Sequence, residues 1–185
     1  MNAYLFLMAR TEHRAGDPVT AEMVTAEMLA LLTEWAQINA TARGRRYGTV
    51  YALVLEMGRW YRPAAFPAGH SRRRGPAKAC HRNAARLAAA VPGLCYIEGF
   101  AAPDLGDGQV LPVEHAWCAD GEVVVDPTWH DPPGRAYLGI PLTLAYRDQV
   151  LRARPRERRC DAVLDAWASP GLLIEGVPAH AIDLP

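Results

Sequence analysis

The chain has 185 residues, of which 50% are hydrophobic, and equal numbers of acidic and basic residues give it no formal net charge. This length suits one domain over residues 1–185, and this composition excludes a disordered chain and does not favour a nucleic-acid partner. No apolar run approaches membrane-spanning length and no secretory signal is recognised, so we expect a cytoplasmic protein without a membrane partner. The four cysteines form no CxxC pair and are expected to be reduced thiols.

The first predicted element is an amphipathic helix within residues 17–42. Asp17 and Pro18 fit its N-cap and first helical position, and apolar residues from Val24 to Ile38 recur at helical spacing. The next segment, residues 49–57, is apolar throughout. Its β-branched start and leucine-rich end leave a helix and a strand equally open.

A long loop is predicted from Gly58 to Ala79, because this segment is rich in proline and glycine. Loops of this length in a compact domain are often functional. Residues 70–78 include the consecutive arginines Arg72, Arg73 and Arg74. These arginines fit a solvated basic loop, or a site that captures an anionic group of a substrate or a nucleic-acid phosphate.

The segment after this loop begins with a cysteine at the start of a predicted helix. From Cys80 onward, the alanine-rich sequence CHRNAARLAAAV has one apolar face and ends at Pro92 and Gly93. The helix therefore carries Cys80 in its first turn. A strand is predicted after it, over residues 95–101.

A β-hairpin with a histidine and an aspartate is predicted next. Residues 113–119 and 122–126 fit two strands around a tight turn at Asp120 and Gly121. A two-residue turn at this place would set His115 directly opposite Asp126, with Cβ atoms about 5 Å apart. The register of the hairpin is thus expected to bring an imidazole to a carboxylate.

The C-terminal part is predicted to be largely helical over residues 142–168. A short strand is expected at residues 137–142, followed by helices at residues 142–154 and 161–168 with a basic linker between them. Together with the N-terminal helix, these elements would flank the sheet.

Cys80, His115 and Asp126 fit a cysteine nucleophile, its base and an orienting carboxylate. A helix N-terminus, nearby positive charge and an imidazole each lower the pKa of a thiol, and the thiolate is the nucleophile. His115 would take the proton and later return it, while Asp126 would hold the ring in one tautomer. The backbone N–H of Cys80 is the expected first oxyanion donor, and Trp60 or Tyr61 is the candidate for the second.

Four residues near these positions have alternative interpretations. Trp117 and Trp129 fit core positions, or walls that exclude water from the site. His81 is expected to be a structural or rim residue, and Glu114 alternates to the strand face opposite the histidine. The cysteines and histidines lack paired metal-ligand spacing, so neither a metal nor another cofactor is expected.

Four blocks of sequence resemble the transglutaminase-like superfamily of papain-like Cys-His-Asp enzymes. The blocks are GPAKACHRNAARLA, YIEGFA, EHAWC and VVVDPTW, within residues 75–130, and they agree with the superfamily in order and spacing. The resemblance implies an α+β papain-like fold in which a cysteine helix packs on an antiparallel sheet. It also implies Cys80 as nucleophile, His115 as base and Asp126 as orienting residue.

The superfamily includes peptidases, amidases, protein-crosslinking acyltransferases, peptide N-glycanase relatives and inactive binding proteins. His81 stands where the eukaryotic crosslinkers commonly have an aromatic residue, and nothing resembles their calcium-binding loops. Hydrolysis of an amide or peptide bond is therefore favoured over crosslinking, with a peptide, a protein or a small amide as substrate. A binding or inhibitory protein on the same scaffold and a cysteine acyltransferase stay open as alternatives.

Overall fold

The computed structural model describes residues 20–38, 44–106, 108–158, 160–169 and 171–183 as a mixed α+β fold. Its helices are α1 (Ala21–Gln37), α2 (Val50–Met57), α3 (Cys80–Ala90), α4 (Leu144–Ala153) and α5 (Leu172–Glu175). Its strands are β1 (Arg59–Tyr61), β2 (Cys95–Ala102), β3 (Val113–Asp120), β4 (Val123–Val125) and β5 (Ala136–Leu142). The strands form one antiparallel sheet of five strands in the order β1-β5-β2-β3-β4. The predicted α+β class is confirmed.

The sheet curls until its two edge strands meet. A bridge joins Arg62, just after β1, to Val123 in β4. The Arg62 N–H donates to the Glu122 carbonyl at 2.8 Å, and the Val124 N–H donates to the Arg62 carbonyl at 3.0 Å. Alternate strand residues on the enclosed side form a small core. Its members are Tyr61, Ile97, Ala101, Trp117, Ala119, Val124 and Tyr137.

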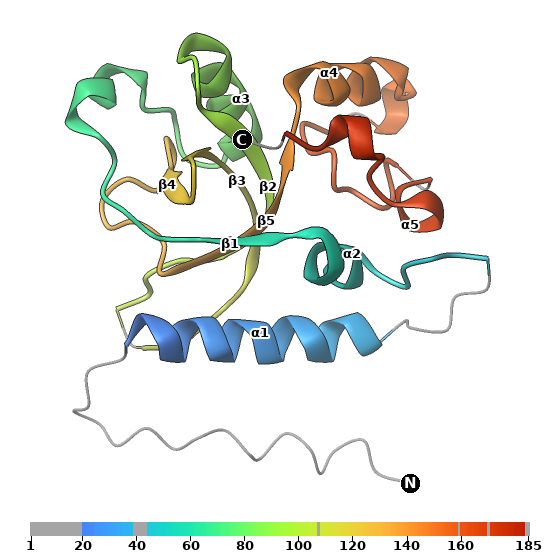
Figure 1. Ribbon diagram of the computed structural model, residues 1–185, viewed down its shortest axis with the longest axis horizontal. Helices are drawn as coiled ribbons and strands as arrows, with labels where there is room; N and C mark the ends of the chain where they lie inside the picture. The colour runs from blue at the N-terminus through green and yellow to red at the C-terminus, as the bar shows by residue number, and fades with distance from the viewer. Residues whose placement is uncertain (1–19, 39–43, 107, 159, 170, 184–185) are drawn as a thin grey trace, which may run out of the picture.

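The opposite face of the sheet shares a larger core with the helices. Met28 of α1, Leu53 of α2 and Leu87 of α3 belong to it, together with Phe100 and Leu138 of the strands. In Figure 1, α1 runs along one end of the molecule, α3 and α4 lie at the other end, and the strands lie between them. Because successive strand residues point to opposite faces, the two cores bury both sides of the sheet.

The predicted N-terminal helix is confirmed as α1, which begins at Ala21. Thr20 is its N-cap and accepts a hydrogen bond from the Met23 N–H at 3.3 Å. The expected capping residues Asp17 and Pro18 lie outside the described residues. Residues 39–42, the end of the range predicted for this helical element, lie outside them as well.

Residues 49–57, which leave helix and strand open in the sequence, form helix α2. Thr49 caps it by accepting a hydrogen bond from the Ala52 N–H at 3.1 Å. The prediction of one continuous loop over residues 58–79 is wrong in part, because this segment contains β1 and a 3₁₀ turn at Ala68–Arg73. A strand of three residues is too short to show an alternating pattern, so its pairing with β5 is set by the neighbouring strand.

The predicted register of the hairpin is wrong. Asp120 pairs with Val123, so the two turn residues are Gly121 and Glu122 rather than Asp120 and Gly121. Gly121 has φ +56°, the left-handed conformation that glycine adopts at little cost. Cys118 pairs with Val125, and Asp126 is the residue after Val125. Asp126 is therefore not directly opposite His115. The two side chains are diagonal neighbours, a separation that an imidazole can still span.

Part of the predicted C-terminal helical region is wrong. The helix expected over residues 142–154 is confirmed as α4, but residues 161–168 form bends and turns. The Glu98 carboxylate accepts hydrogen bonds from the Val163 N–H at 2.8 Å and the Leu164 N–H at 2.9 Å. Because Glu98 is buried in the sheet, this tertiary contact overrides the local helical pattern and ties the C-terminal segment to β2.

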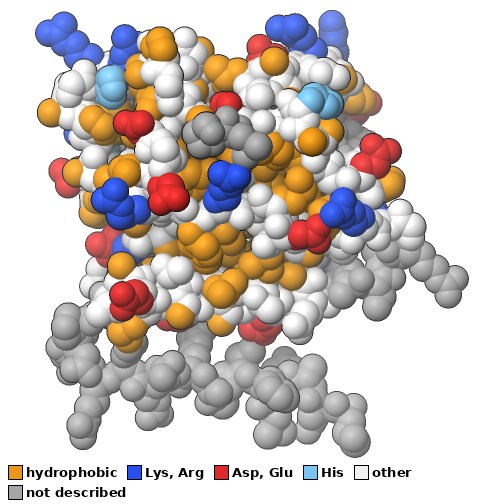
Figure 2. Space-filling view, viewed as in Figure 1, with side chains coloured by type: hydrophobic (Ala, Val, Ile, Leu, Met, Phe, Trp, Pro, Cys, Tyr) orange, Lys and Arg blue, Asp and Glu red, His pale blue; other side chains and the backbone are white. Residues whose placement is uncertain are grey.

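The exterior carries charges of both signs. Figure 2 shows acidic and basic side chains interspersed on one face, with hydrophobic side chains between them. Among the described helices, none combines the length and the apolar character that crossing a lipid bilayer requires.

Candidate active site

Cys80 is the first residue of α3, as predicted, and its side chain is half-buried. No side chain caps this helix end, because the N-cap residue is Ala79. The unpaired N–H groups of the first turn and the helix dipole therefore favour negative charge at the thiol. The Cys80 Sγ also lies 3.4 Å from Nδ1 of His81, the next residue of the helix.

His115 and Asp126 are both buried and are bound to each other. Nε2 of His115 lies 2.7 Å from Oδ2 of Asp126. The same carboxylate oxygen accepts a hydrogen bond from the Tyr137 hydroxyl at 3.0 Å. The other oxygen accepts the N–H groups of Thr128 at 2.8 Å and Trp129 at 3.0 Å. These bonds fix the carboxylate against the ring and favour the tautomer with a proton on Nε2.

Cys80 and His115 interact beyond the end of the short strand β4. β4 pairs only with the last residues of β3, Cys118–Asp120, so the histidine lies beyond that ladder. Helix α3 packs on β3, and the interaction between Cys80 at its start and His115 lowers the pKa of the thiol and raises the pKa of the imidazole. Since Nε2 is bound to the aspartate, Nδ1 is the ring nitrogen available to the sulfur.

The pKa shifts of the thiol and the imidazole favour an ion pair around neutral pH. Burial would raise the pKa of the Cys80 thiol, but hydrogen bonds with His115 and His81 lower this pKa to about 5. Burial would lower the pKa of His115, but hydrogen bonds with Asp126 and Cys80 raise it to about 9. Between these values the proton resides on the imidazole, which leaves a thiolate able to act as a nucleophile.

Three aromatic side chains surround the histidine. Trp129 stacks on the His115 ring, with centroids 3.8 Å apart and planes inclined by 10°. Trp117 lies in the enclosed core with its ring centroid 6.2 Å away, and Tyr137 lies at 6.3 Å. Trp129 therefore walls the site, as one of the two interpretations predicts, while Trp117 is a core residue behind it.

Asn83 connects the two segments that carry the cysteine and the aspartate. Its side-chain amide donates to the Pro76 carbonyl at 2.8 Å and to the Thr128 hydroxyl oxygen at 3.0 Å. Gly75 packs so closely on this amide that a Cβ there would lie 2.0 Å from it, and the Gly75 N–H donates to the Pro127 carbonyl at 2.8 Å. The loop before α3 and the loop after β4 are thus fastened together. Sequence reasoning missed Asn83, and a polar residue on the otherwise alanine-rich face of α3 is the signal that marks it.

Replacing Asn83 by alanine is expected to lower the free energy of unfolding by about 1–3 kcal/mol, since buried partners lose their hydrogen bonds. The rate of Cys80 alkylation by iodoacetamide at pH 6 should fall as well, because the loops that hold the thiol near His115 and Asp126 separate. Urea unfolding and initial rates measure the two effects, with Arg82→Ala as an exposed control in the same turn of the helix. Unchanged stability and rate in Asn83→Ala would contradict this assignment.

Trp60 and Tyr61, the candidates for a second oxyanion donor, lie on β1. Tyr61 is a member of the enclosed core and packs edge-on against Trp117, with ring centroids 5.8 Å apart. Trp60 faces the other way and is 37% exposed. The contacts of the described residues join neither side chain to Cys80, so their oxyanion role stays a prediction.

Arg72, Arg73 and Arg74 are exposed at the end of the 3₁₀ turn that precedes α3. The Arg74 guanidinium lies over the Phe66 ring, 5.5 Å from its centroid. The Arg74 carbonyl accepts a hydrogen bond from Arg86 of α3 at 3.3 Å. The basic loop is therefore anchored beside the cysteine helix while its charges face solvent, which both interpretations of the arginines require.

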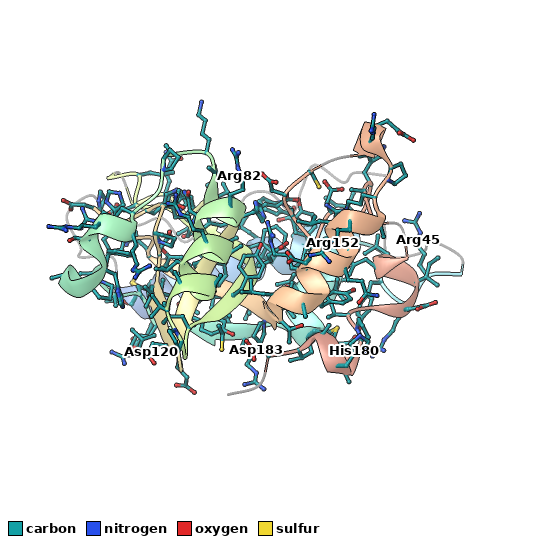
Figure 3. The ribbon with its side chains drawn as sticks, turned by 90° about the horizontal axis from the view of Figure 1, so that it is seen from above. Arg45, Arg82, Asp120, Arg152, His180 and Asp183 are labelled. Carbon is teal, nitrogen blue, oxygen red and sulfur yellow. The ribbon has the colours of Figure 1, made fainter. Side chains whose placement is uncertain are left out.

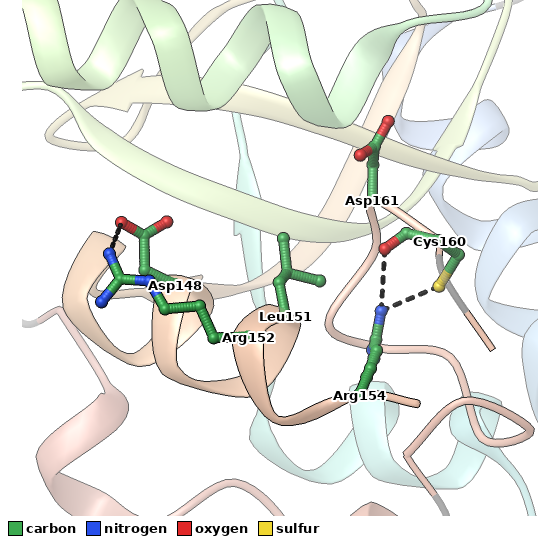
Figure 4. Close-up of a pocket in the computed structure, with 6 residues that line it drawn as sticks. All are labelled: Asp148, Leu151, Arg152, Arg154, Cys160 and Asp161. Carbon is green, nitrogen blue, oxygen red and sulfur yellow. Dashed lines mark hydrogen bonds and ion pairs between the residues drawn. The ribbon is translucent and has the colours of Figure 1, made fainter. Parts of the chain in front are cut away.

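The cavity beside the candidate site is small, about 10 Å³, which is room for about one water molecule. It is lined by Val50, His81, Glu98, Gly99, Phe100, Glu114, His115, Ala162 and Leu164. Glu114 thus lies at the site although its strand position faces away from the His115 ring. A larger cavity of about 590 Å³ lies along α4 and the segment after it, and contains none of the three candidate catalytic residues (Figure 4).

Within the described ranges, His, Cys, Asp and Glu side chains do not gather in groups of three that a metal ion would need. The candidate site consists of Cys80, His115 with its bound Asp126, and the indole of Trp129 that stacks on the imidazole. Comparisons of the chain with protein-family models, with curated proteins and with solved structures found no match.

Proposed function

We propose that this protein is a cysteine hydrolase of the transglutaminase-like, papain-like type, which cleaves an amide or peptide bond through a thioester at Cys80. The observation that carries the proposal is the buried His115, bound to Asp126 at 2.7 Å and interacting with a thiol whose pKa is lowered to about 5. A structural cysteine has no need of a neighbour that removes its proton at neutral pH. The cysteine at a helix start and the curled antiparallel sheet that carries its partners also support this fold family.

Acylation begins with attack of the Cys80 thiolate on the carbonyl carbon of the substrate. The carbon–sulfur bond forms and the carbonyl π electrons move to the oxygen, to which the backbone N–H of Cys80 donates a hydrogen bond in this mechanism. Collapse of this intermediate breaks the carbon–nitrogen bond. His115 delivers its Nδ1 proton to the leaving nitrogen, so an amine departs and a neutral imidazole remains.

Deacylation uses the same histidine as a base. Neutral His115 removes a proton from water as the water oxygen attacks the thioester carbon. The carbon–sulfur bond then breaks, its electron pair returns to sulfur, and the carboxylic acid product leaves. Asp126 keeps Nε2 engaged throughout, so Nδ1 faces the reacting atoms in both half-reactions.

The proposal is tested with p-nitrophenyl acetate, an activated ester that needs no specific binding pocket. We expect an acetyl group on Cys80, located by peptide mass mapping, followed by release of acetate with continued turnover. Lack of acetylation at Cys80, or a stable acetyl-enzyme that water never cleaves, would contradict a hydrolase. Transfer of the acetyl group to an added amine in preference to water would point to an acyltransferase instead.

Alkylation by iodoacetamide is expected to distinguish Cys80 from the other cysteines by pH. Its rate should rise as the pH increases through about 5 and then stay level, because the thiolate is already formed. Burial raises the pKa values of Cys95, Cys118 and Cys160, so these thiols should remain unmodified at pH 6. Mass mapping after brief labelling at pH 6 checks this, and equal labelling of Cys80 and Cys95 would refute it.

A further inference from the structure

Two histidines lower the pKa of Cys80, and the second one, His81, is not part of the proposed triad. Nδ1 of His81 lies 3.4 Å from the Cys80 Sγ. Its other nitrogen, Nε2, lies 3.9 Å from Oε2 of Glu98, and the His81 side chain is only 18% exposed. The ring is thus placed between the reactive sulfur and a carboxylate, as His115 is placed between the same sulfur and Asp126.

Glu98 is held in a fixed position below this histidine. Its side chain is 1% exposed and accepts a hydrogen bond from the Tyr96 hydroxyl at 2.6 Å. It also accepts the N–H groups of Val163 and Leu164. A buried carboxylate with these partners cannot turn away from the imidazole without leaving backbone donors unpaired. Glu98 therefore gives His81 a fixed anionic partner on the side away from the sulfur.

The charged and titratable groups around His81 come from α3 and from two strands. Burial lowers the pKa of His81, whereas the hydrogen bond with Cys80 and the charge of Glu98 raise it, and the net direction is upward. His115 acts against this as a second positive charge. Glu114 interacts with His81 as well, and it lines the same small cavity. Cys80 and Glu98 thus favour the protonated His81 ring.

We propose that His81, aligned by Glu98, is a positioning residue that donates a second hydrogen bond to the Cys80 sulfur. This proposal rests on the proposed hydrolase function. His115 gives up its proton during acylation and takes one from water during deacylation. His81 keeps its own proton in both steps, so the sulfur retains a donor when the carbon–sulfur bond breaks and its electron pair returns.

The test compares the pH dependence of Cys80 alkylation in His81→Gln and in the native protein. In His81→Gln, the loss of one charge-assisted hydrogen bond is expected to raise the midpoint of Cys80 alkylation by about one to two pH units. Deacylation should slow about tenfold or more, so that acetyl-enzyme from p-nitrophenyl acetate accumulates. Arg82→Gln is the matched control, since it removes a positive charge from the same helix turn. Arg82, labelled in Figure 3, is exposed and pairs with Asp161.

Nitrogen chemical shifts of His81 in the native protein give a second measurement that needs no variant at this position. We expect the ring to titrate above the ordinary histidine range, and its midpoint to fall after Cys80 is blocked with iodoacetamide. An unchanged alkylation midpoint in a folded His81→Gln protein, or a His81 titration indifferent to Cys80 alkylation, would overturn the inference. Both titrations are independent of turnover, so absence of ester hydrolysis alone would count against the proposed function and leave this contact standing.

Discussion

Cys80→Ala is expected to remove nearly all hydrolysis of p-nitrophenyl acetate by the protein. Removal of the nucleophile of a catalytic triad lowers turnover by about 10⁶-fold. The alanine has no atom able to form the thioester. Stopped-flow release of p-nitrophenolate measures the loss, and mass spectrometry of the quenched protein should show no acetyl adduct.

The structure supplies a matched control for this variant. Cys95 begins β2, is half-buried as Cys80 is, and has a pKa that burial raises. Cys95→Ala should leave both turnover and acetylation unchanged. A Cys80→Ala protein that still turns over the ester, with a native circular dichroism spectrum, would show that another group is the nucleophile and would end the hydrolase proposal at this residue.

The local order of residues was enough to predict the elements that carry the site. A cysteine before an alanine-rich amphipathic run predicts a helix start, and α3 begins at Cys80. An alternating segment around His115 predicts a strand, which is β3. These predictions succeed because helix propensity and side-chain periodicity act over a few neighbouring residues.

Features that depend on distant contacts were predicted less well. The hairpin register is wrong because the sequence permits the turn at Asp120 or one residue later, and only the packing of the whole curled sheet selects Gly121 and Glu122. His115 and Asp126 nevertheless meet, since a diagonal pair also lies within reach. The correct partners were thus predicted from an incorrect register.

Buried polar groups were the hardest features to assign. Glu98 appears in the sequence as an ordinary acidic residue of a strand, yet its carboxylate replaces a predicted helix by capturing the N–H groups of Val163 and Leu164. These hydrogen-bond donors lie 65 and 66 residues from Glu98 in the chain. The same buried carboxylate lies 3.9 Å from Nε2 of His81, a contact that the expectation of a structural or rim residue does not include.

His115→Asn is expected to abolish acylation almost as fully as loss of the cysteine, by about 10⁶-fold. Asparagine retains an amide that can donate to Asp126, so the buried carboxylate keeps a partner, but no group remains to accept and return the proton. The alkylation midpoint of Cys80 should rise well above 5, because the hydrogen bond with His115 is the largest influence that lowers the pKa of this thiol. It should stay below the ordinary thiol range as long as His81 is present.

Turnover and the midpoint of Cys80 alkylation, measured in His115→Asn and in His81→Gln, therefore distinguish the roles of the two histidines. If His115 is the base, His115→Asn loses turnover and raises the midpoint, whereas His81→Gln raises the midpoint and slows mainly deacylation. His180→Asn serves as the control, since His180 is exposed and packs against Tyr146, 6.1 Å between ring centroids, away from the site (Figure 3). Native turnover in His115→Asn together with complete loss in His81→Gln would reverse the assignment, and would make the His81–Glu98 pair the base and its orienting carboxylate.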